Sequence, residues 1–252
     1  MNMNILLTND DGIHAPGLKA LFQALRKTNN VSVVAPDREK SATSHRLTIH
    51  EPLRAFPYHD GIEGFAVNGT PVDCIKLGVS KLLPQKPDWV ISGINPGVNT
   101  GYNVFYSGTV AAARESASMW IPSMAVSIAI GPSIDYDGAA EYISHLFNQC
   151  ARQILPAGTL LNVNFPACPV HETKGLKLVN QAIYHLYEKY EKRQDPRNVS
   201  YYWIGDEKIP VTQECFTDVG AIENNYISIS PLFIDTTDYN FLKQMKHWDW
   251  DH

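Results

Sequence analysis

The feature that most constrains the fold is a short apolar run near the N-terminus that ends in two adjacent aspartates. Residues 5–7 are long enough only for a buried strand, and the carboxylates of Asp10 and Asp11 follow shortly after. Gly12 permits a sharp turn, and Pro16 suits the first turn of a helix. Ligands bind at the carboxyl ends of strands in an open α/β sheet, where adjacent like charges are costly unless a cation or protons offset them. The pattern predicts a functional turn; a solvated Asp-Asp-Gly turn is the alternative.

The elements predicted after this turn alternate between helix and strand. A helical stripe over residues 17–27 and an apolar run over 31–35 complete a βαβ unit. Next we expect a hairpin over 47–67, a helix capped by Thr70, strands over 89–91, 123–130 and 160–165, and helices over 110–119 and 137–154. This alternation predicts an α/β fold, namely a Rossmann-like doubly wound, mostly parallel sheet over residues 1–166. Residues 167–252 are expected to form a C-terminal extension of hairpins and short helices that completes the core and takes part in oligomerisation.

The composition argues against several classes of protein. The chain has 252 residues, of which 44% are hydrophobic and 19% charged, as is typical of a globular protein with a substantial core. Its net charge of -5 argues against DNA binding through overall charge. The most apolar later run, residues 119–130, is too short to span a membrane. The cysteines have no CxxC spacing, which predicts reduced thiols and a cytoplasmic location; they are Cys74, Cys150, Cys168 and Cys215.

Three later segments are predicted to reach the same edge of the sheet as Asp10. The polar loop over residues 39–48 leaves the second strand and carries the Ser41 hydroxyl, and Asn95 follows a later strand. Residues 107–109 read Ser-Gly-Thr and open a helix, whose free N–H groups and positive dipole end would bind an anion. A solvated loop and simple helix capping are the alternatives for these segments.

The oxygen atoms of these side chains predict a metal of a particular kind. Carboxylate, hydroxyl and amide oxygens are hard ligands that suit Mg²⁺ or Mn²⁺ better than zinc. The histidines form no HxH or HExxH pattern, so zinc has little support. A metal beside an anion-binding helix terminus indicates phosphate chemistry, in which the metal would neutralise phosphate charge and activate a water.

Several sequence blocks carry a resemblance to a known family. They read TNDDGIHAPG at 8–17, VVAPDREKSA at 33–42, NGTPVDC at 68–74, SGINPGVN at 92–99 and YSGTVAAARE at 106–115, with weaker matches DPRNVSYYWIG at 195–205 and YISISPL at 226–232. The sequence resembles the SurE family of stationary-phase survival proteins over nearly its whole length. It departs from the family pattern where glycine is common, with Ala-Thr-Ser-His after Ser41 and with Asn198 and Asn225. Asparagine tolerates the left-handed conformation better than most residues.

By this resemblance the chain is expected to be a divalent-metal-dependent 5′-nucleotidase that hydrolyses nucleoside 5′-monophosphates to nucleoside and phosphate. Family members also act on 3′-monophosphates or short polyphosphate. The resemblance implies one Mg²⁺ or Mn²⁺ per subunit and a homodimer or homotetramer formed through an exchanged C-terminal segment. The implied metal ligands are Asp10, Asp11, Ser41 and Asn95, and the implied phosphate-binding residues are Asn9, Ser107, Gly108 and Thr109. Asp10 and Asp11 are the expected catalytic residues, with a free oxygen of Asp10 accepting a hydrogen bond from the attacking water.

Other classes of function compete with this one. A nucleotide-binding module without hydrolysis could use the same helix start, although it would not need adjacent carboxylates. A dinucleotide-dependent oxidoreductase would need GxGxxG in the first turn, which the sequence lacks. A haloacid-dehalogenase phosphatase would need a nucleophilic aspartate in a DxD pattern, which Asp10-Asp11-Gly12 does not supply. An activated water is therefore favoured over a phospho-aspartate.

Overall fold

A computed structural model describes residues 2–183, 189–205 and 216–250. The strands are β1 (Asn4–Thr8), β2 (Asn30–Pro36), β3 (Ala55–Tyr58), β4 (Gly64–Val67), β5 (Trp89–Pro96), β6 (Ser123–Ile128), β7 (Thr159–Phe165), β8 (Leu176–Leu178), β9 (Lys189–Gln194), β10 (Ser200–Gly205) and β11 (Ile227–Phe233). The α-helices are α1 (Pro16–Leu25), α2 (Pro71–Leu77), α3 (Asn103–Tyr106), α4 (Gly108–Ser118), α5 (Tyr136–Cys150), α6 (Asp218–Glu223) and α7 (Tyr239–Met245). Shorter helical turns span Gly78–Leu82 and Val170–Glu172.

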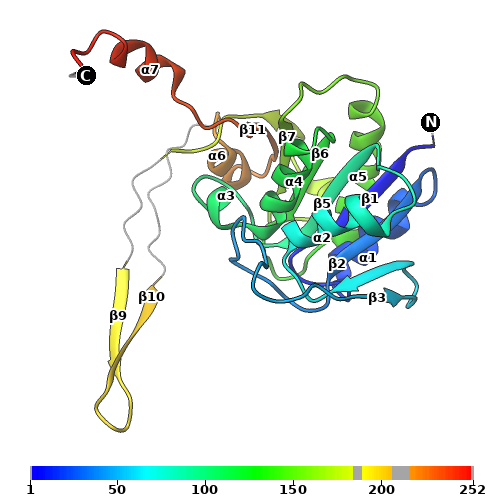
Figure 1. Cartoon of the computed structure of the whole chain (residues 1–252), viewed down its shortest axis with the longest axis horizontal. Helices are drawn as coiled ribbons and strands as arrows, with labels where there is room; N and C mark the ends of the chain where they lie inside the picture. The colour runs from blue at the N-terminus through cyan, green and yellow to red at the C-terminus, as the bar shows by residue number, and fades with distance from the viewer. Residues whose placement is uncertain (1, 184–188, 206–215, 251–252) are drawn as a thin grey trace.

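One large sheet organises the molecule, and β1 is one of its inner strands (Figure 1). Its strand order is β3-β4-β2-β1-β5-β6-β7-β11-β8. Leu7 of β1 pairs in parallel with Val33 of β2 on one side and with Ile91 of β5 on the other. The chain therefore moves outward from β1 in one direction and later in the other. This topological switch point is where open α/β sheets bind ligands, just beyond the carboxyl end of β1.

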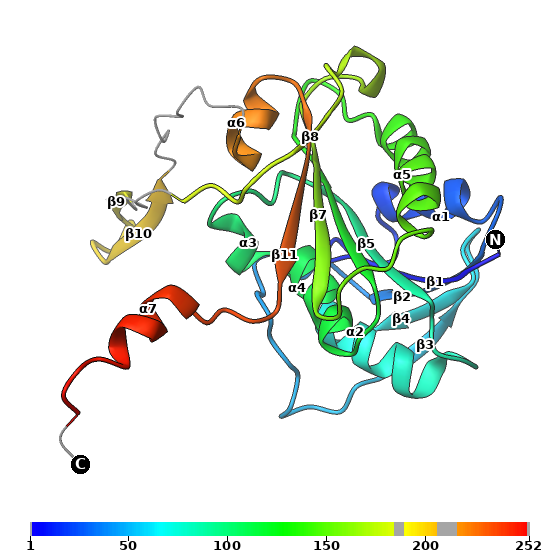
Figure 2. The ribbon, with the colours of Figure 1, turned by 90° about the horizontal axis from the view of Figure 1, so that it is seen from above.

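Helices cover both faces of the sheet, so its central strands are buried on both sides (Figure 2). On one face, Leu18 and Phe22 of α1 and Phe147 of α5 pack on the sheet. On the other face, Ile75 of α2 and Ala112 of α4 pack on it. The predicted doubly wound α/β fold is confirmed. The continuous apolar runs of its parallel strands follow from burial on both faces.

Most predicted elements are present, with changes at their ends. The predicted helix over 137–154 is shorter, as α5 ends at Cys150, and the predicted hairpin is reduced to β3 and β4. Thr70 caps α2 as expected, because its side chain accepts a hydrogen bond from the Asp73 N–H while the Asp73 carboxylate accepts one from the Thr70 N–H. Asn198 and Asn225 have φ of 60° and 61°, so both adopt the expected left-handed conformation.

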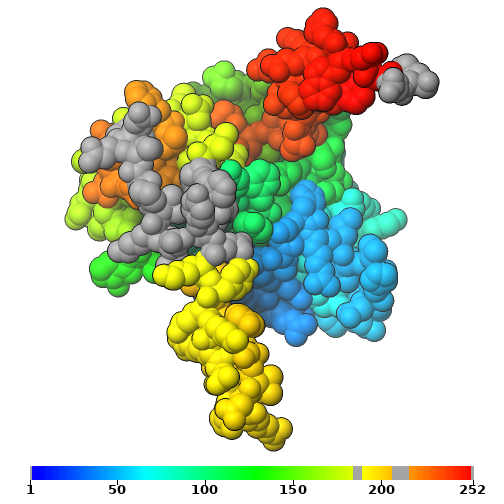
Figure 3. All heavy atoms as spheres, turned by 90° about the vertical axis from the view of Figure 1, so that its left-hand side faces the viewer, coloured from blue at the N-terminus to red at the C-terminus, as the bar shows by residue number. Residues whose placement is uncertain are grey.

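The C-terminal part of the chain adds strands to the same sheet. β11 pairs antiparallel with β7, and β8 pairs in parallel with β11. By contrast, the β9–β10 hairpin and α7 project from the body (Figures 1 and 3). None of the helices in the described parts of the chain is long and apolar enough to cross a bilayer. Cys74, Cys150 and Cys168 are free thiols, and Cys215 lies outside the described residues.

Candidate functional site

The adjacent aspartates lie immediately beyond the carboxyl end of β1, but their surroundings differ. Asp10 is 4% exposed, and its carboxylate accepts a hydrogen bond from the hydroxyl of Thr109 at the start of α4. Asp11 is half-buried, and its Oδ2 is a buried atom without a hydrogen-bond partner. Gly108 approaches Asp10 so closely that an added Cβ would lie 2.9 Å from the Asp10 Cβ. This segment of α4 therefore fixes the position of Asp10.

Burial changes the acidity of both carboxyls. Burial raises the pKa of Asp11 to about 7, and the nearby negative charges of Asp10 and Glu39 add to the rise. Burial also raises the pKa of Asp10, although the hydrogen bond from Thr109 opposes the rise. Two acidic groups that resist losing their protons mark a site where a positive charge would be strongly favoured.

The loop after β2 brings Ser41 to the site. The Lys40 N–H donates a 2.7 Å hydrogen bond to the carbonyl of Asp10, and the Ser44 N–H donates a 3.0 Å bond to the carbonyl of Tyr106. Ala42 and Ser44 have φ of 55° and 52°, so both adopt the left-handed conformation. They lie in the segment after Ser41 where glycine is common in the family pattern. The Ser41 hydroxyl itself is exposed and donates a 2.6 Å hydrogen bond to Glu39.

Asn95 reaches the site from inside a strand, which corrects a sequence prediction. The strand predicted to end at residue 91 continues to Pro96, and its pairing with β6 shifts register between Ser92 and Asn95. The irregularity lies at Gly93, which has φ of 142°. The prediction was wrong because glycine and proline suggested a loop, whereas pairing with the neighbouring strand keeps the segment in the sheet. The Asn95 amide donates a 2.6 Å hydrogen bond to the carbonyl of Gly97, which leaves its oxygen free for other contacts.

The Ser-Gly-Thr segment begins α4 as predicted. Ser107 is the N-cap, and its hydroxyl oxygen accepts a 3.0 Å hydrogen bond from the Val110 N–H. The capping alternative is thus realised for Ser107, but its hydroxyl proton remains able to donate. Thr109 is fully buried and engages Asp10. Asn9 donates a 2.9 Å hydrogen bond to the carbonyl of Gly12, while its buried side-chain oxygen has no partner.

A cavity of about 240 Å³ brings four of the sequence-predicted side chains together. They are Asp10, Ser41, Asn95 and Ser107. Because Asp10 is an expected catalytic residue, we call this cavity the catalytic hollow. The other four predicted residues do not line the cavity; they are Asn9, Asp11, Gly108 and Thr109. Asp11 is next to Asp10 in the chain, and Gly108 and Thr109 both contact Asp10. Tyr106 and Asn103 also line the hollow, and the sequence reasoning assigned them no role.

Buried polar residues in and around the hollow hold its loops in place, and most had no clear sequence signal. The Asn99 N–H donates a 2.8 Å hydrogen bond to Asn164 of β7, and the Asn99 carbonyl accepts a 2.8 Å bond from Asn162. Asp218 of α6 accepts a 2.9 Å hydrogen bond from the Gly101 N–H. Glu115, in the alanine-rich α4, accepts a 2.7 Å hydrogen bond from His45 of the Ser41 loop. Among these residues only Glu115 had a sequence signal, because it is a charged residue in a helix that is rich in alanine.

The donor set of the hollow fits a hard divalent cation. The described residues contain no group of three or more His, Cys, Asp or Glu side chains that could hold a metal, so a carboxylate-rich or histidine-rich site is absent from them. The hollow instead joins a carboxylate with hydroxyl and amide oxygens. The unpartnered buried oxygens of Asn9 and Asp11 are acceptors, so both would gain a partner from a cation.

Comparisons with known proteins agree with this architecture. A family model described as "Survival protein SurE" matches residues 5–188. A protein of Desulfatibacillum aliphaticivorans named 5'-nucleotidase SurE is 48% identical over 98% of each chain, and one of Carboxydothermus hydrogenoformans with the same name is 44% identical over 98% of this chain and 96% of its own. A crystal structure of the Aquifex aeolicus Sure protein has a TM-score of 0.86 and 38% identity, covering 97% of this chain and 98% of its own. Taken with the strand order and the hollow at the end of β1, these matches show that the chain belongs to the SurE family.

Proposed function

We propose that this chain is a 5′-nucleotidase, a phosphoric monoester hydrolase that converts nucleoside 5′-monophosphates to nucleoside and phosphate with one Mg²⁺ or Mn²⁺ per subunit. The observation that carries the proposal is the convergence of Asp10, Ser41, Asn95 and Ser107 on one hollow at the switch point of the sheet. The relatives that match this chain over nearly full length are named 5'-nucleotidases. Asp10, Asp11, Ser41 and Asn95 would hold the cation.

Each part of the site has a role in this reaction. The cation would supply charge neutralisation at the phosphate and would acidify a bound water. Ser107 and the free N–H groups at the start of α4 orient the phosphate oxygens, and Asn9 contributes to the same anion site. Thr109 holds one oxygen of Asp10, so the other oxygen can accept a proton from the attacking water. As water bonds to phosphorus, the ester P–O bond breaks and the nucleoside oxygen takes up a proton.

Phosphate release from a panel of nucleoside 5′- and 3′-monophosphates tests the proposal. With Mg²⁺ or Mn²⁺ we expect release that falls to background in EDTA and returns when metal is restored, because the carboxylates alone would repel the substrate. The same panel, extended with short polyphosphate, tests the wider substrate range that the family resemblance implies. Nucleotide binding without phosphate release under every metal would instead identify a binding module.

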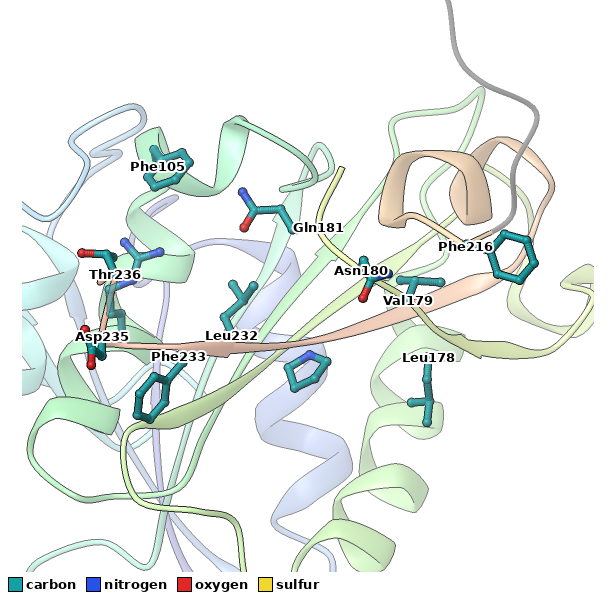
Figure 4. Close-up of a pocket in the computed structure, with 12 residues that line it drawn as sticks. Phe105, Leu178, Val179, Asn180, Gln181, Phe216, Leu232, Phe233, Asp235 and Thr236 are labelled. Atoms are coloured by element: carbon teal, nitrogen blue, oxygen red, sulfur yellow. The ribbon is translucent and has the colours of Figure 1, made fainter. Parts of the chain in front are cut away.

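We also propose that residues 1–166 form the nucleotidase core and that residues 167–252 serve oligomerisation as well as completing the sheet, in a cytoplasmic homodimer or homotetramer. None of the α7 residues is buried in the single chain, and Phe241, Trp248 and Trp250 are exposed. A cavity of about 570 Å³ beside β11 offers aromatic walls that include Phe105 and Phe233 (Figure 4). An α7 from a second copy would bury its apolar side chains there.

Removal of residues 237–252 is expected to convert the oligomer to monomer, because the exposed apolar side chains of α7 would no longer be available for burial between subunits. Light scattering coupled to size-exclusion chromatography measures the mass. A full-length chain that is monomeric at micromolar concentration, or a truncated chain that keeps its oligomeric mass, would refute this role.

A further inference from the structure

A second cavity, of about 420 Å³, lies on the loop that follows β2 and is lined by cationic side chains. Arg38, Lys40, Arg46 and His50 all contribute to its lining, and Glu51 is the acidic residue among the described residues that line it. We call this cavity the basic pocket. The concentration of positive charge is notable in a chain whose net charge is -5.

The cations of the basic pocket are largely unneutralised. Within the described parts of the chain, no ion pair involves Lys40 or Arg46. Arg38 approaches Asp37 at 3.9 Å, but its side chain is 76% exposed, so this contact neutralises little of its charge. The positive charges around the basic pocket repel one another, and an anion bound in the basic pocket would offset that repulsion.

The basic pocket and the catalytic hollow share one loop. Ser41 and Ala42 line the catalytic hollow, whereas Lys40 and Thr43 line the basic pocket. The backbone of this loop is fixed on the catalytic side by the hydrogen bond from the Lys40 N–H to the Asp10 carbonyl. The two cavities are therefore both lined by residues 40–43 and differ in charge, since the catalytic hollow carries a carboxylate and the basic pocket carries cations.

We propose that the basic pocket is a second anion site that binds a phosphate group independently of the divalent cation. Arginine and lysine donors suit phosphate oxygens, and the rim exposure of Arg38 and Arg46 lets an anion enter from solvent. The phosphate group can come from free inorganic phosphate or from a second phosphate on a substrate held in the catalytic hollow. The proposal does not require that the chain hydrolyses nucleotides.

Calorimetric titration of inorganic phosphate into full-length protein in EDTA tests the site. EDTA removes the cation that would hold phosphate in the catalytic hollow, so binding that depends on Lys40 and Arg46 reports the basic pocket. We expect Lys40→Ala/Arg46→Ala to weaken binding at least tenfold and Arg46→Lys to weaken it less, because lysine keeps the charge. Arg152→Ala, which removes an exposed charge that does not line the pocket, should bind as the wild type does. Absent binding by the wild type, or equal binding by the double variant, would overturn the proposal.

Two further variants separate this site from the catalytic one. Asn95→Ala, which removes a proposed metal ligand but no negative charge, should keep its phosphate affinity in EDTA even though it lowers turnover, so failure of the proposed activity would not be mistaken for failure of the anion site. Arg46→Ala distinguishes the source of the phosphate. A KM raised at least fivefold for a nucleoside 3′,5′-bisphosphate, with an unchanged KM for the monophosphate, supports a second substrate phosphate. Unchanged KM values for both, together with lost phosphate binding in EDTA, support free phosphate as the ligand.

Discussion

Asp10→Asn and Asp11→Asn are each expected to lower kcat/KM for a nucleoside 5′-monophosphate by at least about 10³-fold, because each removes a negative charge that holds the cation. The Asp10→Asn variant also lacks the carboxylate that Thr109 orients and that would accept a proton from the attacking water. The fold should survive, since asparagine has nearly the same shape and burial of either carboxylate is unfavourable in the metal-free protein. Steady-state kinetics and calorimetric Mn²⁺ binding measure the two effects, while circular dichroism and the Tm report the fold.

Asp137→Asn is the matched control for these variants. Asp137 is an exposed aspartate in the first turn of α5, and its replacement removes the same charge away from the catalytic hollow. Its kinetics and Mn²⁺ affinity should equal those of the wild type. Activity close to normal in both Asp10→Asn and Asp11→Asn would contradict the assignment of these residues as ligands and catalytic groups.

Gly93→Ala is expected to destabilise the protein by about 3 kcal/mol and to weaken Mn²⁺ binding at least tenfold. Gly93 has φ of 142°, and a Cβ there would lie 2.3 Å from the main-chain oxygen of Val126 in β6. A rigid neighbouring strand cannot yield as a side chain can, so β5 must shift. Asn95 lies two residues further along this strand and would move with it. Chemical denaturation gives the stability, and calorimetry gives the metal affinity.

Gly61→Ala separates the general cost of a left-handed alanine from the specific clash. Gly61 has φ of 69°, but no atom lies within 4 Å of the position of an added Cβ. Its replacement should cost only about 1–2 kcal/mol and leave Mn²⁺ affinity unchanged. If Gly93→Ala were no more destabilising than Gly61→Ala, then the close approach of β5 to β6 would not be what fixes Asn95.

The α/β class, the doubly wound sheet and the positions that meet at its edge could all be predicted from the amino-acid sequence. Strands that are buried on both faces are rich in apolar residues, so residues 5–7 and 31–35 were recognisable as strands without any tertiary information. Asp10 lies two residues after β1, Ser107 lies immediately before α4, and Ser41 lies in the loop that leaves β2. Because parallel strands share a carboxyl edge, their meeting in one cavity could be foreseen from chain order.

The length of β5, the cavities along the Ser41 loop and the contacts that support the loops depend on segments that are far apart in the chain. The extension of β5 to Pro96 depends on pairing with β6, and no local pattern in a glycine- and proline-containing segment reveals such a partner. The division of the Ser41 loop between an acidic and a basic cavity depends on which side of the loop each residue faces, which an aperiodic segment does not encode. The support of Gly101 by Asp218 joins residues 117 positions apart. Contacts of this kind arise only when distant segments pack, because the energy that selects them comes from burial and pairing rather than from local conformational preference.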